Sequence, residues 1–384
     1  MSSSDATPSP CGEGGRGVRL AFLLAKPTQF DAPFFQWLQR HRPGIPFKVY
    51  YWQPVDTGAD TDTETGRSLA WGINLLEGYP WLQADPGQPD AFENELRQNG
   101  VRYLVSNGWK KGFAPLLKAA QKQGTALGLR IDSVAWDIPP HLLLARRIVL
   151  GRAYKKFSLF FSSGSLCDDY LRKIGISQEK IRRWPYIIDD AFFARNPRRI
   201  EEALVLRQRY ALDERPVVLS VCKWVDRENP AELLQAFIQL NDAGLQLVMV
   251  GDGALRPRLE ALRRQARQLS ITFPGYVPYT ELPAWYALSS VFVHPARREV
   301  WGVSIHEALA AGCAAIGSSR VGSACDLIVP GGNGYTYPLG NLPALAQAIR
   351  QALAIPPSAI AATNAAILPQ WSYAAQAWVF EEFR

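Results

Sequence analysis

The stretch "HPARREVWGVSIHEALAAG", residues 294–312, follows an apolar run of strand length and carries two glutamates. Glu299 lies in a polar turn, whereas Glu307 falls in a run with helical spacing. A buried strand, a polar turn and a helix in succession are typical of a parallel α/β sheet. A Trp-Gly pair interrupts the helical run, so we expect Ser304 to cap the helix and Glu307 to reach back to its N–H, as in a capping box. The alternative is that both acids bind a ligand at the edge of the sheet.

The same alternation of apolar runs and helical patterns extends over the whole chain. Several of the runs are apolar throughout, as expected for parallel strands buried on both faces. Because the alternation is repeated twice, the sequence predicts an α/β protein with two doubly wound, Rossmann-like domains. The expected strands are VRLAFLLA, PFKVYYW, RYLVS, ALGLRI and LFFSS in the first half, and VVLSV, LQLVMVG, ITFPG, VFVHP and AAIG in the second.

Four segments are predicted along the 384 residues, which are too many for one typical domain. Residues 1–17 have no apolar segment after a basic one, so they read as a disordered tail and not as a secretory signal. Residues 18–195 form the first domain and residues 196–370 the second. Residues 371–384 are expected to form an amphipathic helix that packs back on the first domain. The Thr-, Asp-, Gly- and Pro-rich stretch Pro54–Pro89 is predicted to be a loop.

The net charge indicates which partners the protein binds, and the cysteines indicate its cellular compartment. The net charge of +7 and the pI of about 9.1 favour anionic partners. Basic residues gather between Arg146 and Arg199, either as solvated helix faces or as a surface that rests on anionic lipid. Nucleic acid is not expected, because the chain contains no recognised binding module. Five scattered cysteines favour a reduced, cytoplasmic protein, peripheral at the membrane surface if the basic run meets lipid.

The sequence contains only incomplete versions of known metal-binding and dinucleotide-binding motifs. The loop "DTDTETG" from Asp60 resembles a calcium loop, but Thr65 and Trp71 occupy the positions that need Gly and Glu. "GDGALR" has Gly251 and a second glycine after a strand, but Arg256 replaces the third glycine of a dinucleotide fingerprint. This turn still suits close approach of a ligand to backbone. The histidines lack metal-ligand spacing, and no GxSxG is present, so we expect neither a metal nor a cofactor.

Several loops at strand ends of the second half carry residues that suit a phosphorylated sugar. Lys223 and Arg227 follow "VVLSV", where basic side chains can reach a phosphate at the carboxyl edge of the sheet. Tyr276 follows "ITFPG" and can line a flat ligand. Backbone N–H groups at the start of the helix near Glu307 suit anionic or hydroxyl-rich ligands. A carboxylate only accepts hydrogen bonds, so it pairs naturally with vicinal sugar hydroxyls.

The ordered set of these motifs resembles a known family. Val217–Leu353 is similar to the nucleotide-sugar half of retaining GT-B glycosyltransferases, in particular glycosyltransferase family 4, the group 1 enzymes. Their E-x7-E signature matches Glu299 and Glu307, and "EALAAG" follows. "GDGALRPRLEAL", "FPGYVPYTELPAWYALSSVFVHP" and "LIVPGGNGYTYPLGNLPALAQAI" match in order and spacing. The first half matches more loosely, through "WGINLLEGYPWL", "NGW", "RIDS" and "PYIIDDAFF".

The resemblance implies two Rossmann-like domains that face a central cleft and a metal-independent, retaining transfer of a hexosyl group. It implies a UDP- or GDP-linked sugar as donor and a glycan, a lipid-linked compound or a small molecule as acceptor, as in polysaccharide biosynthesis. Glu307 would hold the ribose hydroxyls and Glu299 the donor sugar, while Lys223 and Arg227 would neutralise the diphosphate. The other donor-binding candidates that it implies or allows are Tyr276 near the base, the backbone of Val300, Trp301, Gly302 and Val303, and Gly251.

The chain departs from the family pattern at three places. Glu228 stands at the second basic position of the first loop, where Arg227 is its neighbour. "AKPTQFDAP" replaces a glycine-rich loop, which makes Lys26 a further phosphate candidate. "RIDS" stands where a His-Asp pair is frequent, which makes Asp132 a further candidate. Two alternatives therefore stay open: a catalytically impaired sugar-nucleotide-binding or scaffold protein, and a nucleotide-sugar epimerase with the same fold.

Overall fold

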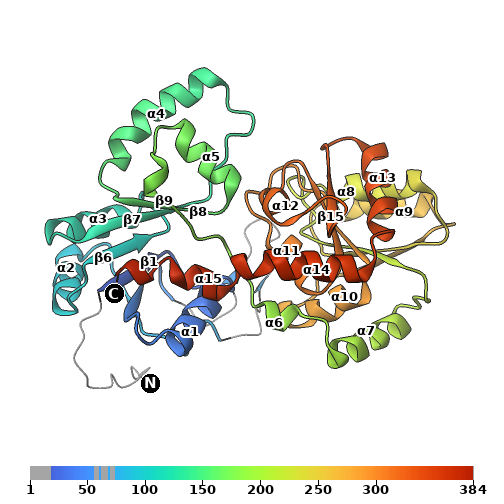
Figure 1. Cartoon of the computed structure of the whole chain (residues 1–384), viewed down its shortest axis with the longest axis horizontal. Helices are drawn as coiled ribbons and strands as arrows, with labels where there is room; N and C mark the ends of the chain where they lie inside the picture. The colour runs from blue at the N-terminus through green and yellow to red at the C-terminus, as the bar shows by residue number, and fades with distance from the viewer. Residues whose placement is uncertain (1–18, 56–59, 62–67, 70–73, 384) are drawn as a thin grey trace.

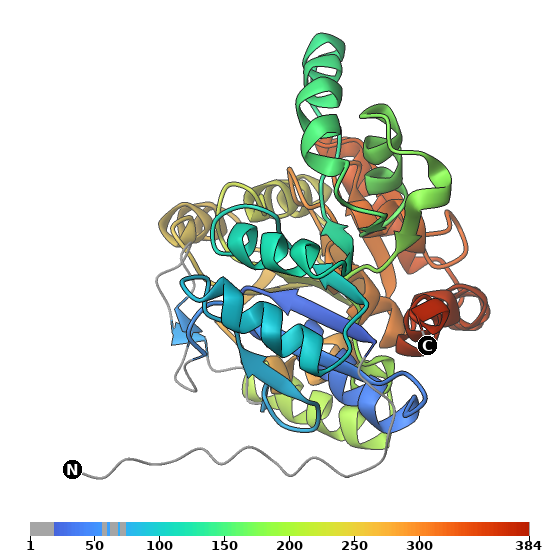
Figure 2. The same cartoon turned by 90° about the vertical axis from the view of Figure 1, so that its left-hand side faces the viewer.

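Two parallel sheets, one in each half of the chain, organise the protein. The computed structural model describes residues 19–55, 60–61, 68–69 and 74–383, so the predicted disordered tail and most of the "DTDTETG" loop lie outside the described residues. One sheet has seven strands in the order β5-β2-β1-β6-β7-β8-β9, and the other has six in the order β12-β11-β10-β13-β14-β15. Helices cover both faces of each sheet (Figures 1 and 2). The prediction of two doubly wound α/β domains is confirmed.

The first domain contains all of the strands predicted for it, and its helices bury two separate cores. Helices α2, α3 and α5 pack on one face of the sheet and α1 on the other. The short strands β5 and β9 were not predicted, because three residues at each edge of the sheet give no periodic signal. The predicted loop Pro54–Pro89 is therefore wrong at β5, which lies within it. The strands are β1 Leu20–Leu24, β2 Phe47–Tyr51, β5 Trp81–Gln83, β6 Tyr103–Ser106, β7 Ala126–Ile131, β8 Leu159–Ser162 and β9 Ile181–Arg183. The helices are α1 Asp31–His41, α2 Pro89–Gln98, α3 Phe113–Lys122, α4 Pro140–Tyr154 and α5 Ser165–Lys173, and a pair of two-residue strands, β3 Asp60–Thr61 and β4 Ser68–Leu69, lies in the predicted loop.

The second domain is wound in the same way. Helices α7, α10, α11 and α12 cover one face of its sheet, and α8, α9 and α13 cover the other. The strands are β10 Val217–Val221, β11 Gln246–Val250, β12 Ser270–Gly275, β13 Val291–His294, β14 Ala314–Ser318 and β15 Gly334–Tyr337, the last of which was not predicted. The helices are α6 Asp190–Phe193, α7 Pro197–Arg209, α8 Pro230–Leu240, α9 Arg256–Gln265, α10 Leu282–Leu288, α11 Val303–Ala310, α12 Gly322–Leu327, α13 Leu342–Leu353 and α14 Pro357–Ile367.

The chain crosses between the domains twice. Ile187 still belongs to a core of the first domain, whereas Ile188 and Phe193 belong to a core of the second. The crossing therefore comes before the predicted boundary at residue 196, because the apolar residues of α6 turn inward onto α11. At the other end, α15, Tyr373–Trp378, returns to pack on α1 (Figure 1).

The terminal helix docks through one side only. Tyr373, Ala377 and Phe380 join the aromatic core of the first domain, where the Phe380 ring lies 5.1 Å from the Trp184 ring. Trp378, by contrast, is 72% exposed. In the described part of the chain, no single helix has the length and apolar content to cross a membrane; the helices of Leu342–Leu353 and Pro357–Phe383 reach that threshold only together, with a 99° bend between them.

Candidate active site

A cavity of about 600 Å³ lies between the domains, at the carboxyl ends of β10, β11 and β13. Ligands of doubly wound sheets bind at this edge. The cavity brings together residues from loops that are far apart in the sequence. Of the site residues predicted from the sequence, those that line it are Asp132, Lys223, Arg227, Gly251, Tyr276, Glu299, Val300, Trp301, Gly302, Val303 and Glu307.

Helix α11 starts at the centre of this lining, and it starts earlier than predicted. Its N-cap is Gly302, whose φ of +88° places it in the left-handed region. A Cβ there would lie 3.1 Å from the Glu299 Cγ, so glycine lets the turn close against this side chain. The expected Ser304 capping box is wrong: Ser304 Oγ lies 3.2 Å from Nδ1 of His294, and the Glu307 carboxylate turns elsewhere.

Glu307 points into a buried environment within the cavity lining. Its side chain accepts a hydrogen bond from the Tyr286 hydroxyl at 2.6 Å, and the residue is 4% exposed. Burial raises the pKa of Glu307 to about 7, and the hydrogen bond from Tyr286 opposes this shift. A carboxylate that is held by one donor retains capacity to accept further hydrogen bonds from a bound ligand.

Glu299, at the other side of the helix start, belongs to an ion-pair network. Arg227 Nη1 lies 2.6 Å from Oε2 of Glu299, and Arg227 Nη2 lies 2.8 Å from Oε1 of Glu228. Burial raises the pKa of Glu228; His294 and Arg227 oppose the shift, and Glu299 adds to it. One guanidinium thus pairs with two carboxylates of the cavity lining, one of which, Glu228, stands at the second basic position of the family pattern.

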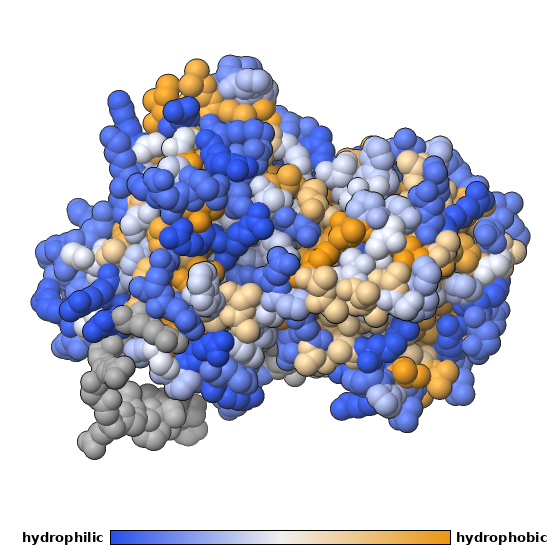
Figure 3. Space-filling model, in the orientation of Figure 1, coloured by the Kyte–Doolittle hydropathy of each residue, from blue (hydrophilic) through white to orange (hydrophobic). Residues whose placement is uncertain are grey.

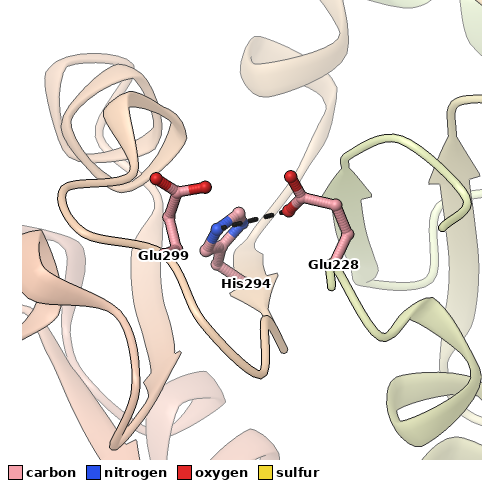
Figure 4. Close-up of side chains that lie close together, drawn as sticks. All are labelled: Glu228, His294 and Glu299. Atoms are coloured by element: carbon pink, nitrogen blue, oxygen red, sulfur yellow. Dashed lines mark ion pairs between the residues drawn. The ribbon is translucent and has the colours of Figure 1, made fainter. Parts of the chain in front are cut away.

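Three of these side chains have the chemistry of metal ligands. Figure 4 shows Glu299, His294 and Glu228 converging, with Nε2 of His294 3.7 Å from Oε2 of Glu228. Their candidate ligand atoms all lie within 4.8 Å of one another. Arg227, however, already contacts both carboxylates, so a metal ion would have to displace the guanidinium. The geometry is therefore that of two carboxylates that form ion pairs with one arginine.

Gly251 is required where two cavity loops meet. Its φ is +143°, and a Cβ would lie 1.9 Å from the Cys222 carbonyl oxygen. Only glycine lets the loop after β11 touch the loop after β10, which carries Lys223. Arg256, which replaces the third glycine of the dinucleotide pattern, instead bonds Asp252 at 2.7 Å and covers the Trp224 ring. Its guanidinium thus contacts one residue from each of these two loops.

The first domain contributes fewer polar groups to the cavity. Asp132 lines it, but Lys26 is exposed and is not part of the lining. Gln29 and Phe30 line the cavity instead, because Thr28 Oγ1 accepts the backbone N–H groups of Phe30 and Asp31 and closes a turn ahead of α1.

A buried arginine fixes this side of the cleft. Arg130 lies 2.6 Å from Asp31 through its Nη1 and donates to the carbonyl oxygens of Trp184 and Pro185. Its guanidinium also lies 4.2 Å from the centre of the Tyr186 ring, which lines the cavity. The "RIDS" segment thus supplies a structural arginine that anchors the crossing segment beside Asp132.

Sequence reasoning missed several residues of the lining. His294 ends β13 and was considered only as a metal ligand, although its place at a strand end was a usable signal. Tyr279 follows the same strand as Tyr276 and could have been found in the same way. Phe30 and Tyr186, whose rings lie 5.8 Å apart, belong to the segments "AKPTQFDAP" and "PYIIDDAFF". Both segments were noted in the sequence, but neither residue was identified as part of a site.

The family of the chain follows from its likeness to known proteins. The sequence profile described as "Glycosyl transferases group 1" matches residues 205–367. The GDP-mannose-dependent alpha-(1-6)-phosphatidylinositol monomannoside mannosyltransferase of Mycobacterium tuberculosis is 31% identical over 289 residues, covering 70% of this chain and 71% of that protein. The chain belongs to the group 1 glycosyltransferases. Membership of this family makes it a glycosyltransferase with a sugar-nucleotide site.

Two further likenesses agree. The alpha-D-kanosaminyltransferase of Streptomyces kanamyceticus is 31% identical over 217 residues, and the match spans 55% of each of the two chains. The crystal structure of HepE from Anabaena in complex with UDP superposes with a TM-score of 0.71 at 15% identity, over 95% of this chain and 98% of that one. The superposition confirms the GT-B fold.

Proposed function

We propose that the protein is a retaining glycosyltransferase that moves a sugar from a nucleoside-diphosphate sugar to an acceptor hydroxyl. The observation that carries the proposal is that Glu299 and Glu307 line one cavity on either side of the start of α11, together with Lys223 and Arg227. Glu307 accepts the ribose hydroxyls and Glu299 contacts the donor sugar. The two cations neutralise the diphosphate, and Tyr276 lies beside the base.

The chemistry would be a front-face transfer. The bond between the anomeric carbon and the diphosphate oxygen breaks, and the acceptor oxygen forms its bond on the same face of the sugar. The departing phosphate oxygen takes the acceptor proton, so no protein base is needed. The protein stabilises the negative charge that develops on the diphosphate through Lys223, Arg227 and the backbone N–H groups at the start of α11. This last contribution needs no charged side chain.

We propose that transfer does not depend on a metal ion or a cofactor. Arg227 occupies the space between Glu228 and Glu299 and supplies positive charge at the diphosphate end. Chelation is therefore expected to leave turnover unchanged. A rate that fell on adding a chelator and returned with one divalent cation would overturn this part of the proposal, and Glu228, His294 and Glu299 would then be the ligands to test.

The donor is proposed to be UDP- or GDP-linked, and the acceptor a glycan, a lipid-linked compound or a small molecule. A relative is named for its use of GDP-mannose and of phosphatidylinositol monomannoside, and HepE binds UDP. We also propose a cytoplasmic location, which agrees with four free cysteines in the described part of the chain.

A second candidate function is sugar-nucleotide binding without efficient transfer. The observation that favours it is the buried Glu228 carboxylate, which draws Arg227 toward itself and away from a diphosphate. This candidate predicts donor binding with neither transfer nor fast donor hydrolysis. An epimerase would need an acid and a base on the first-domain side of the cavity, where Asp132 and Tyr186 are the ionisable residues of the described lining.

The first test is a thermal-shift screen against UDP, GDP, ADP and their common sugar conjugates. A ligand at about a hundred times its Kd stabilises the fold by roughly 2.7 kcal/mol, which is readily measured. We expect one nucleotide series to act, and the shift to vanish in Glu307→Ala and Lys223→Ala. The acting donor is then offered with candidate acceptors, and NMR of the product reads the anomeric configuration. No shift with any nucleotide, or a product with inverted configuration, would contradict the proposal.

A further inference from the structure

Helix α4 stands out from the body of the first domain. Figures 1 and 2 show it projecting beyond the sheet and beyond its neighbour α5. Of its fifteen residues only Tyr154 is buried, and Leu143, Leu150 and Ala153 pack partly on the core below. The helix therefore contacts the core along one narrow side only, and the rest of its surface is exposed.

The outward side of α4 is apolar where a soluble helix is normally polar. Leu144, Ile148 and Val149 are 60%, 60% and 67% exposed, and Leu142 is 47% exposed. Leu144 and Ile148 are four residues apart, so they lie one above the other. Figure 3 shows the hydrophobic patch over this helix. Clustered exposed aliphatic side chains of this kind mark a surface that binds another protein or a membrane.

Basic residues continue the same surface. The sequence between Asp137 and Asp168 has five basic residues and no acidic one. Arg152 follows Ile148 by four residues and Lys155 follows Arg152 by three, so one line of the helix runs from aliphatic to basic. Beside α4 lies a groove of about 420 Å³ that is lined by Arg147, Arg152, Lys155 and Lys180 over an apolar floor that includes Phe157.

We propose that α4 and this basic groove dock the protein on an anionic lipid bilayer. Exposed aliphatic side chains enter the interface between headgroups and acyl chains, and the surrounding cations hold anionic headgroups. The mixture of the two side-chain types favours a bilayer over a protein partner, because the charges all have one sign. The loop that lines the cavity at Asp132 leads directly into α4 at Pro140. Docking therefore brings the bilayer to the first-domain side of the cleft, opposite the proposed donor-binding residues. A lipid-linked acceptor, one of the three proposed classes, would enter the cleft from this side.

The test is cosedimentation of the full chain with vesicles. We expect binding to vesicles of phosphatidylcholine mixed with phosphatidylglycerol at low salt, weaker binding at high salt, and much weaker binding to phosphatidylcholine alone. Leu144→Asn with Ile148→Asn should lower the affinity at least ~10-fold, because two aliphatic side chains no longer enter the interface. Arg152→Gln with Lys155→Gln should lower it about 5-fold for each cation removed.

A matched control comes from α7, whose Leu204 and Val205 are 51% and 61% exposed. Leu204→Asn with Val205→Asn should bind vesicles like the unchanged protein. All variants should keep their melting temperature and their response to the nucleotide, so loss of docking is distinguished from loss of the proposed function. Absence of vesicle binding at low salt, or equal losses in the α4 and α7 variants, would overturn the proposal. A concentration-dependent dimer that the α4 variant abolishes would also overturn it, because α4 would then be covered by a second copy.

Discussion

The two domains have the same type of fold and line the same cavity, but they contribute different kinds of side chain to it. The second domain lines the cavity with five charged side chains, those of Lys223, Arg227, Glu228, Glu299 and Glu307. Arg227 pairs with Glu228 and Glu299, and the buried Tyr286 hydroxyl holds Glu307. The first domain contributes one carboxylate, from Asp132, beside aromatic and amide side chains. A ligand that carries two phosphates and a ribose needs fixed charges and fixed acceptors, whereas an acceptor hydroxyl needs little more than shape and one hydrogen bond.

The difference assigns one task to each side of the cleft. Variants of the second domain should change both donor binding and turnover. Variants of the first domain should change the response to the acceptor alone. The predictions below test this contrast. They begin with the residue on which the ion-pair network of the second domain depends, and they end with an ion pair between the two domains.

The largest effect is expected for Arg227→Ala. The guanidinium lies between the Glu228 and Glu299 carboxylates, so its loss leaves both of them facing an anionic donor. One charge-assisted contact is worth about 1.5–3 kcal/mol, and the added repulsion should bring the fall in turnover to at least ~100-fold. Initial-rate kinetics with the donor found in the screen would measure it.

The control for Arg227 is Arg263→Ala. Arg263 is equally exposed, at 39% against 38%, and pairs with Glu260 on α9 away from the cavity. Its loss should leave turnover within about 2-fold, as is usual for surface ion pairs. Arg227→Ala should also lower the melting temperature, because it leaves the buried Glu228 carboxylate without its cation, and adding Glu228→Gln should recover part of that loss. Equal effects of the two arginine variants on turnover would remove Arg227 from the site.

Lys223→Ala should lower turnover at least ~10-fold, because one charge-assisted contact to the diphosphate is lost. The loop that carries Lys223 is fixed by the close approach of Gly251 to Cys222, so no other residue is expected to move into its place. Lys223→Arg keeps the charge and should retain more activity than Lys223→Ala. Unchanged turnover in Lys223→Ala would exclude a role for this residue in transfer.

Much of the second domain's site could be predicted because its signals are local. Lys223, Tyr276 and Glu299 each follow a strand within a few residues, and the edge of a parallel sheet gathers such positions. The orientation of Glu307 could not be predicted in this way. Its partner Tyr286 is 21 residues away, and the left-handed Gly302 displaced the helix start from Ser304.

The first domain's side was hard to predict because its residues meet only through the fold. Lys26 was proposed for its charge, but the turn at Thr28 presents Gln29 and Phe30 instead. Tyr186 reaches the cavity from the crossing segment, where the buried Arg130 anchors it. No spacing rule connects residues 30, 130 and 186. Tertiary packing alone brings them to one wall.

Glu307→Gln should weaken nucleotide binding about 10-fold, because an amide nitrogen replaces one acceptor of the ribose hydroxyls. The pKa of about 7 adds a pH dependence. The ionised form is the better acceptor, so nucleotide affinity should rise between pH 6 and pH 8 in the unchanged protein and stay flat in Glu307→Gln. Calorimetric titration at several pH values measures both. A flat profile in the unchanged protein would contradict the assignment of the ribose to Glu307.

The same group should affect stability in the opposite direction. Its folded-state pKa is raised from 4.5, so its contribution to the ligand-free fold is complete below pH 4.5 and is lost as pH rises toward about 7. Tyr286→Phe removes the hydrogen bond that opposes this shift, so the midpoint of the binding profile should move to higher pH. Melting curves of Glu307→Gln should lack this part of the pH dependence. An identical pH dependence in both proteins would mean that Glu307 is not the titrating group.

The smallest effect is expected at an exposed ion pair between the two domains. Arg320 of the second domain holds the Asp137 carboxylate through two bonds of 2.8 Å, and its guanidinium lowers the pKa of Asp137. Asp137 lies on the loop that lines the cavity at Asp132, so Arg320→Gln should loosen the acceptor wall while leaving the donor wall intact. The KM for the acceptor should rise by no more than ~3-fold, as expected for an exposed pair, and the nucleotide Kd should not change. If Arg320→Gln weakened nucleotide binding as much as acceptor use, the two sides of the cleft would not be separable, and the division of tasks between the domains would have to be abandoned.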